Sequence, residues 1–265
     1  MTNMHDQGEN QPTLHHLGII HLMQNTVSSP NGKSLTSLAV ERLRGDILSG
    51  LLRPAERLRI QALSERYEIG ATAIREALSR LVTDGLVDSE DQRGFCVTPV
   101  SREDLVDLTE TRVQVECAGL RQALVRGGVE WESNVLSAFH RLQRTPTPSS
   151  PDLHEAWASV HRQFHEALLV GCVSPWTLRL CRLLYDQSER YRNLAEQHTS
   201  GANRDAMTEH RELMDAAMAR DADRATQLLG EHFWATTGII LKAVFNEGET
   251  PGDVQRRGGR KKHNP

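Results

Sequence analysis

Apolar residues recur at helical spacing over most of the chain from residue 101 onward, and the breaks between these stretches are rich in Gly, Pro or Ser. Ser101, followed three residues later by an acidic side chain, is typical of a capped helix start. The pattern predicts helices at about 102–126, 131–144, 153–170, 175–198, 203–219 and 222–245. We therefore expect an all-helical bundle of about six helices over residues 101–245.

The segment 34–98 has shorter elements and a different order. Its apolar pattern predicts a helix that ends at Gly50, helices at about 61–67 and 72–84 joined by a tight turn at 68–70, and a hairpin with strands at 86–87 and 95–97. This is the layout of a winged helix-turn-helix. The expected fold is therefore mainly α, with an N-terminal winged helix-turn-helix followed by the helical bundle.

The two ends of the chain lack this periodicity. Residues 1–33 are polar and hold four histidines, and we expect them to form a flexible N-terminal arm. Residues 246–265 contain a group of Arg and Lys side chains, and we interpret them as a basic flexible tail. Solvated tails are the favoured interpretation; metal binding by the first and phosphate contact by the second are the alternatives.

Composition excludes several classes of protein. The 265 residues carry 31 Lys and Arg against 35 Asp and Glu, which argues against non-specific coating of nucleic acid but not against a specific reader. No apolar run reaches the length of a membrane span and no secretory segment is evident, so we expect a cytoplasmic protein without a membrane partner. Four cysteines without CxxC spacing are expected to be reduced thiols.

The predicted third helix has an apolar face and a polar face, and the polar face carries candidate DNA contacts. Arg75 can donate two hydrogen bonds to a guanine edge, and Thr72 and Ser79 can bond to phosphates. Candidates for the DNA backbone and the minor groove are Arg59, Arg93 and Gly94. Between residues 33 and 84 nine basic residues stand against seven acidic ones, so charge alone does not distinguish this face from a solvated helix surface.

The N-terminal unit contains recognisable segments, which are Leu51 to Pro54, Arg57 to Leu78, Gly85 to Val87, Arg93 to Phe95 and Val97. Together they resemble the signature of the GntR family of bacterial transcriptional regulators over about residues 35–98. The resemblance implies a winged helix that binds a near-palindromic operator as a dimer. The family's Ser-Arg-Thr-Pro turn is replaced by residues 70–73, so one signature arginine is absent and the operator sequence cannot be carried over.

Four of the 12 histidines have the spacing of a single site. His161 and His165 lie four residues apart, on one helix face. His210 and His232 each lie 11 residues from Asp221, where the helices are expected to turn, so an antiparallel pair places them at one height. Four imidazoles suit a divalent metal ion, with Zn or Ni first among the candidates. The alternative is four separate core or surface histidines.

The helical part has its own recognisable segments, which are Arg112 with Glu116, Phe164 to Leu168, His210 with Ala216, Ala217 and Asp221, and Ala225 to His232. Together they resemble the FCD ligand-binding domain of the FadR-type branch over about 101–243. The resemblance implies a metal held by an Asp and three His, which map onto His165, His210 and His232, while His161 stands at the Asp position. It also implies a small carboxylate effector near the metal.

Arg112 is the candidate second anchor for that carboxylate, and an internal ion pair with Glu116 is the alternative. A set of four neutral ligands leaves the charge of the ion uncompensated and should favour an anionic ligand. Loss of the metal site through the change to His161 is the other interpretation of this substitution.

These observations predict a ligand-responsive transcriptional regulator rather than an enzyme. It binds a double-stranded DNA operator as a homodimer, and the resemblance implies a repressor. We expect the linker at 98–101 to transmit effector binding, with residues 102–104 close to the wing. The alternatives are a regulator for which the ion is the signal and, less favoured, a metal-dependent hydrolase. Arg162 follows His161, where the HExxH protease motif requires Glu.

Overall fold

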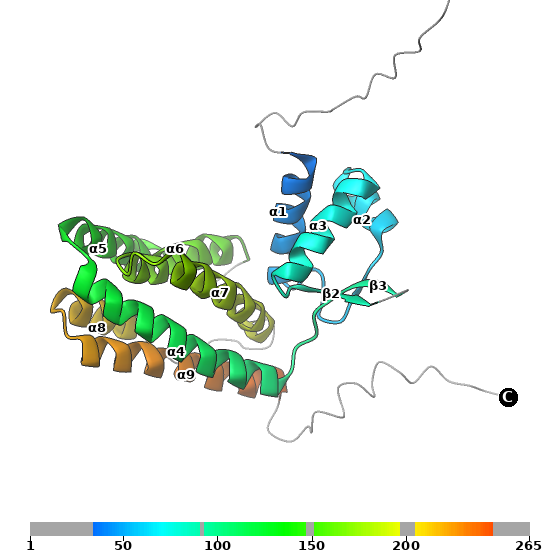
Figure 1. Cartoon of the computed structure of the whole chain (residues 1–265). Helices are drawn as coiled ribbons and strands as arrows, with labels where there is room; N and C mark the ends of the chain where they lie inside the picture. The colour runs from blue at the N-terminus through cyan, green and yellow to red at the C-terminus, as the bar shows by residue number, and fades with distance from the viewer. Residues whose placement is uncertain (1–33, 91–92, 147–150, 197–204, 246–265) are drawn as a thin grey trace, which may run out of the picture.

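The computed structural model describes residues 34–90, 93–146, 151–196 and 205–245. Within these ranges the chain forms nine α-helices and one small antiparallel sheet (Figure 1). This confirms the expected mainly α fold, with a winged helix-turn-helix at the N-terminus and six helices after it. The predicted arm at 1–33 and the predicted basic tail at 246–265 lie outside the described residues.

The N-terminal unit contains three helices and three strands, which are α1 (Leu35–Leu48), β1 (Arg57–Leu58), α2 (Ile60–Tyr67), α3 (Ala71–Thr83), β2 (Val87–Glu90) and β3 (Gly94–Val97). The strands pair antiparallel in the order β1-β3-β2, so β2 and β3 form the predicted hairpin. Strand β1 was not predicted, because two residues cannot show an alternating pattern. Its pairing with β3 defines it, and Leu58 lies opposite Phe95.

Local conformations explain where the helices of this unit stop. Helix α2 ends at Glu68, which adopts a left-handed conformation with φ 56°, so the tight turn does not rely on Gly70. After α3, Gly85 has φ 69° and redirects the chain into the hairpin. The apolar face of the unit is fully buried and includes Leu43, Ile74, Leu78, Leu81 and Leu86.

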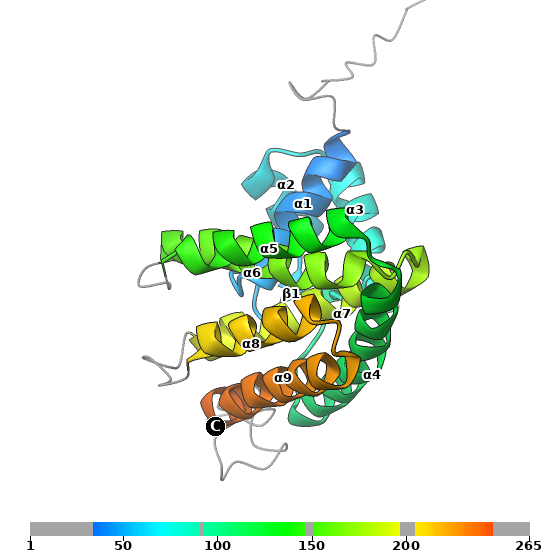
Figure 2. The ribbon, with the colours of Figure 1, turned by 90° about the vertical axis from the view of Figure 1, so that its left-hand side faces the viewer.

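The bundle is formed by α4 (Arg102–Arg126), α5 (Val129–Arg144), α6 (Pro151–Val170), α7 (Pro175–Glu196), α8 (Ala206–Met218) and α9 (Ala222–Phe245). The Ser101 hydroxyl accepts a hydrogen bond from the Asp104 amide at 3.0 Å and caps α4. The main helix contacts pair α4 with α9 and α7, α5 with α6, and α8 with α9 (Figure 2). Across the four described ranges, no helix is both long and apolar enough to cross a membrane.

Helix α7 joins the bundle to the winged helix. Its side chains donate hydrogen bonds to three backbone carbonyls of the N-terminal unit or the linker, namely Gln187 to Asp84 at 2.8 Å, Asn193 to Leu48 at 2.6 Å, and Arg190 to Thr98. The expected approach of residues 102–104 to the wing does not appear among the described contacts. Asp104 instead accepts a hydrogen bond from Tyr191 of α7 at 2.5 Å.

Replacing Gly85 with Ala is expected to lower the free energy of unfolding by about 1–2 kcal/mol, because an L side chain in the left-handed region is strained. The added Cβ would also lie 3.3 Å from Nε2 of Gln187. The matched control is Gly45→Ala in α1, where the added Cβ meets nothing within 4 Å. That change should raise the free energy of unfolding by about 0.5–1 kcal/mol. Urea denaturation measures both, and an unaltered stability of Gly85→Ala would contradict strain at this turn.

Candidate metal centre and DNA-binding surface

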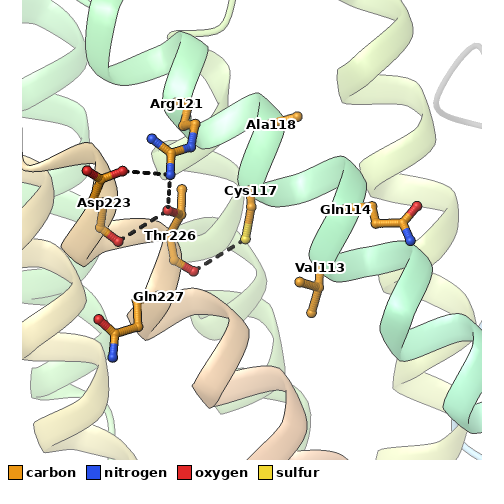
Figure 3. Close-up of a pocket in the computed structure, with 8 residues that line it drawn as sticks. All are labelled: Val113, Gln114, Cys117, Ala118, Arg121, Asp223, Thr226 and Gln227. Carbon is orange, nitrogen blue, oxygen red and sulfur yellow. Dashed lines mark hydrogen bonds and ion pairs between the residues drawn. The ribbon is translucent and has the colours of Figure 1, made fainter.

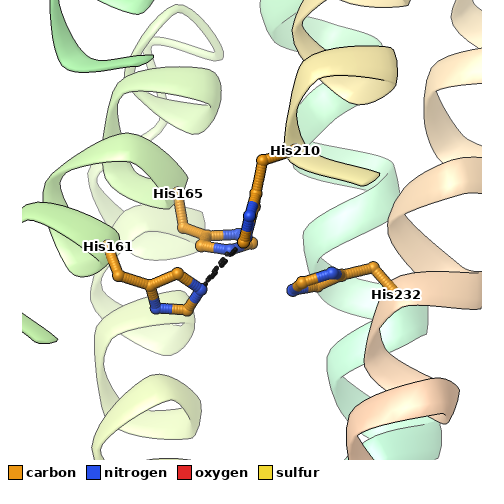
Figure 4. A group of neighbouring side chains, drawn as sticks. All are labelled: His161, His165, His210 and His232. Atoms are coloured by element: carbon orange, nitrogen blue, oxygen red, sulfur yellow. Dashed lines mark hydrogen bonds between the residues drawn. The ribbon is translucent and has the colours of Figure 1, made fainter. Parts of the chain in front are cut away.

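Four histidine side chains meet inside the bundle (Figure 4). Helix α6 supplies His161 and His165, α8 supplies His210, and α9 supplies His232. One ring nitrogen from each lies within 4.8 Å of the other three, and all four residues are buried. Nε2 of His161 lies 3.1 Å from Nε2 of His165 and 3.2 Å from Nε2 of His210. The structure therefore brings the four residues named from the sequence to one point.

The electrostatics of this point suit metal ligands. Burial lowers the pKa of His161 and of His165 well below the usual 6.5, and neighbouring histidines and Arg192 lower both further. The two rings are therefore neutral, and a neutral imidazole has a lone pair to offer to a cation. Bonds of 2.0–2.1 Å from Zn to nitrogen in a tetrahedron place the nitrogens about 3.3 Å apart, close to the 3.1 and 3.2 Å that separate Nε2 of His161 from Nε2 of His165 and of His210. The donor set thus fits a divalent ion.

Neighbouring side chains form hydrogen bonds to the Nδ1 atoms of two of the four rings. The Tyr185 hydroxyl of α7 hydrogen-bonds Nδ1 of His161 at 3.0 Å, and a Glu209 carboxylate oxygen lies 2.9 Å from Nδ1 of His232. Partners of this kind orient histidine ligands and raise their basicity. Trp157 also stacks on the His161 ring at 4.6 Å. Sequence reasoning missed Tyr185 and Glu209, although Glu209 stands next to His210 and could have been examined.

Arg112 is engaged inside the bundle. Its Nε donates to Glu116 at 2.7 Å and its Nη1 donates to Ser188 at 2.8 Å, while its Nη2 has no hydrogen-bond partner among the described residues. The guanidinium lies 3.9 Å from the centre of the Phe233 ring. Burial raises the pKa of Glu116, and Arg112 opposes that rise. The ion pair with Glu116, which the sequence left open as the alternative, is the arrangement that the structure contains.

A cavity of about 310 Å³ opens beside the histidines between α5, α6 and α7. Its wall includes His165, Tyr185 and Glu116. Two cationic side chains, Arg141 of α5 and Arg182 of α7, also line it. Sequence reasoning did not select these arginines, because they lie on separate helices and no spacing relates them. Glu166 of α6 lines it as well, so the wall carries side chains of both charges.

A wider groove of about 530 Å³ lies on the outer face between α4 and α9 (Figure 3). Its polar side chains bond to one another: Arg121 donates to Thr226 at 3.2 Å and pairs with Asp223 at 2.8 Å. None of the four clustered histidines lines it. The groove therefore lacks a histidine of the cluster, whereas His165 lines the smaller cavity.

The candidate DNA contacts lie on an exposed surface of the winged helix. Thr72, Arg75 and Ser79 are exposed along α3. The Ser79 hydroxyl donates to the Arg75 carbonyl at 3.0 Å, so it must rotate to reach a phosphate. Glu76, on the same helix, accepts hydrogen bonds from Arg80 at 2.6 Å and from Thr36 at 3.1 Å. The carboxylate of Glu76, beside Arg75, is therefore paired with Arg80.

The remaining candidates border this surface at the start of α2 and in the wing. Arg59 is the exposed residue before α2. Arg93 and Gly94 are exposed where the hairpin enters β3, and Gly94 has φ 83°, a conformation that glycine adopts without strain. The six residues thus all belong to the surface of one small unit.

Two family models match the chain. Residues 35–97 match the gntR family of bacterial regulatory proteins, and residues 107–235 match the FCD domain. The HTH-type transcriptional regulator BphR of Paraburkholderia xenovorans is 43% identical over 213 residues, which cover 79% of this chain and 86% of that protein. The chain belongs to the GntR family.

Further relatives agree with this membership. The HTH-type transcriptional repressor GlaR of Escherichia coli is 34% identical over 216 residues, which cover 80% of this chain and 98% of the repressor. The solved structure of E. coli McbR/YncC has the same fold, with a TM-score of 0.68 and 21% identity over 79% of this chain and 98% of that chain. This GntR-family protein is a DNA-binding transcriptional regulator with an FCD domain, and the families and relatives that it matches are not enzymes.

The metal-free regulator is expected to lose stability as the pH falls through about 6.5. The folded-state pKa of His161 and of His165 is depressed, so below 6.5 the unfolded chain binds protons that the folded chain rejects. The free energy of unfolding then decreases by at most about 1.4 kcal/mol per pH unit for each histidine. Denaturation in the presence of a chelator at several pH values measures this slope. His161→Gln should reduce it, and an identical slope in that variant would contradict the assignment.

Proposed function

We propose that this GntR-family protein is a repressor that binds a near-palindromic operator as a homodimer and responds to a small carboxylate at a metal centre. The proposed division of the chain is a DNA-binding domain at 34–98 and an effector-binding and dimerisation domain at 101–245. The observation that carries the proposal is the buried cluster of four histidines, which opens onto a cavity that contains arginines. We propose the cytoplasm as its location.

The proposed role as a repressor is supported by GlaR, which is named a repressor and shares 34% identity over most of both chains. The dimer is supported by the physics of operator recognition, since two half-sites of a near-palindrome mirror a twofold axis in the protein. Arg75 would read a base edge in each half-site, Thr72 and Ser79 would bond to phosphates, and Arg59, Arg93 and Gly94 would flank the contact.

His161, His165, His210 and His232 would hold the ion, with Zn or Ni as the first candidates. The ion would supply a Lewis-acid attachment point for one oxygen of a carboxylate. Four neutral ligands leave its charge uncompensated, which favours an anion over a neutral ligand. Arg141 and Arg182 would attract the anion into the cavity, and Arg112, through its Nη2 atom, would be the second anchor.

A regulator that responds to the ion itself is the second candidate. It is favoured by the same burial, because four enclosed imidazoles form a site that needs no other ligand to hold an ion. A titration of Zn²⁺ against operator affinity, repeated with and without a panel of organic acids and sugar acids, separates the two. A response to Zn²⁺ that no acid alters supports the ion as the signal. Thermal-shift screening of the metal-loaded protein identifies the acid.

Arg75→Ala is expected to remove about 1–3 kcal/mol of discrimination between the operator and random DNA, because a bidentate contact to guanine is lost. The operator fragment can be obtained by selection of bound duplexes from a random pool, and gel shifts then measure both affinities. Arg121→Ala, an exposed substitution in α4 away from the winged helix, is the control and should leave discrimination unaltered. Specific binding that persists in Arg75→Ala would remove the role assigned to that residue.

His165→Ala is expected to lower metal affinity by at least about 100-fold, since even loss of a residue that only supports a ligand costs 10–100-fold. Elemental analysis of the purified protein and calorimetric titration with Zn²⁺ measure this. His140→Ala, which changes an exposed histidine of α5, is the matched control. His161→Asp should keep the metal and weaken carboxylate binding, because it adds a negative charge to the ligand set. A parent protein without stoichiometric metal would refute the metal centre.

A further inference from the structure

Helix α7 has one face toward the rest of the bundle and another toward the winged helix (Figure 1). On the first face, Tyr185 hydrogen-bonds His161. On the second, Gln187 and Asn193 bond to the carbonyls at the ends of α3 and α1. The same helix therefore contacts both the candidate metal centre and the C-terminal ends of α1 and α3.

Asp186 lies between these faces and is shared by the two domains. One carboxylate oxygen accepts a hydrogen bond from Arg44 of α1 at 2.6 Å, and the other accepts from Arg162 of α6 at 2.5 Å. The Asp186 side chain is only 13% exposed, so it is poorly screened by solvent. Arg44 also pairs with Asp84 at the end of α3. One carboxylate thus links the bundle to the recognition helix.

Arg162 connects this link to the histidines. It follows His161 in the sequence, and its guanidinium lies 4.3 Å from the centre of the Tyr185 ring. The hydroxyl of that ring is bonded to Nδ1 of His161. A cation held by the imidazoles would repel the Arg162 guanidinium, whose side chain is 30% exposed, so solvent screens part of this repulsion. Arg44 and Arg162 bond to separate oxygens of Asp186, so they compete only for its single negative charge. A charge at the histidines that weakens the pair with Arg162 would therefore leave more of this negative charge to Arg44.

We propose that Asp186 is the positioning residue that couples the histidine site to the DNA-binding domain. The ligand state of the histidines sets the position of Arg162, Arg162 and Arg44 compete for one carboxylate, and the outcome sets how firmly the end of α3 is held against α7. The inference rests on the proposed function for the identity of the signal. The two ion pairs on Asp186 are present in the described side chains, and the proposed competition between them can be tested without a metal.

The metal-free test removes each of the two arginines that pair with Asp186 in turn. Arg44→Met removes the ion pair between the winged helix and Asp186, and hydrogen exchange of the amides at residues 80–86 should become faster. Arg162→Met removes the ion pair between α6 and Asp186, so that Arg44 is left as the partner of this carboxylate. The same amides should then exchange more slowly. If the two ion pairs were only structural and did not compete, both variants would show faster exchange of these amides. Equal directions of change, or no change in either variant, would overturn the proposal.

The test with metal uses Zn²⁺ and the selected operator fragment. In the parent protein, Zn²⁺ should change operator affinity by at least about fivefold, the lower limit of ordinary allosteric coupling. Asp186→Asn should bind Zn²⁺ with the same stoichiometry while this change falls to less than twofold. Glu212→Gln is the matched control, because it removes a carboxylate from an exposed ion pair with Arg224 and should leave the response intact.

Failure of the coupling and failure of the proposed function give different results. A parent protein that binds Zn²⁺ while its operator affinity stays constant overturns the coupling and leaves the metal centre. A parent protein that binds no Zn²⁺ refutes the metal centre, and the exchange rates of Arg44→Met and Arg162→Met then decide the competition at Asp186. Opposite shifts in those two variants support it, and any other pattern refutes it.

Discussion

Four imidazole rings share one buried point, and this is stable only if the rings remain neutral or surround a cation. The requirement determines how the bundle is arranged. Helices α6, α8 and α9 must hold their histidines at one height, and the apolar residues beside the rings, Phe164 and Phe233, are both buried. Tyr185 and Glu209 satisfy the outer nitrogens of two rings. The histidine site therefore forms part of the core of the bundle, and the same helix packing positions both.

The replacement of an expected carboxylate by His161 changes the charge of this interior. A set of neutral ligands leaves an ion with its full positive charge, and the adjoining cavity is lined by Arg141 and Arg182. In the proposed function, an anion from outside the chain would supply the negative charge that the ligand set lacks. Arg112 donates to Glu116 and Ser188 in this structure, and its Nη2 atom has no partner within the described ranges.

Helix α7 contacts both the candidate metal centre and the winged helix. The helix is rigid, its side chains reach the ends of α1 and α3, and Asp186 divides its hydrogen bonds between a residue of the bundle and a residue of the winged helix. Partly exposed ion pairs of this kind contribute little net stability. Their value here is directional, because a shared carboxylate converts a change of charge in one domain into a change of contact in the other.

The sequence by itself determined the features that depend on short spacing: the helices, the hairpin, the cap at Ser101 and the two histidine pairs, one four residues apart and one symmetric about a turn. The tertiary structure decided what depends on contacts between helices. It created β1 by pairing it with β3, placed Tyr185 behind His161, and joined Arg112 to Glu116 rather than leaving it open. It also placed the domain contacts on α7. The physical reason is that periodicity specifies which face of an element is buried, whereas the partner of a buried polar side chain is selected by the packing of whole helices.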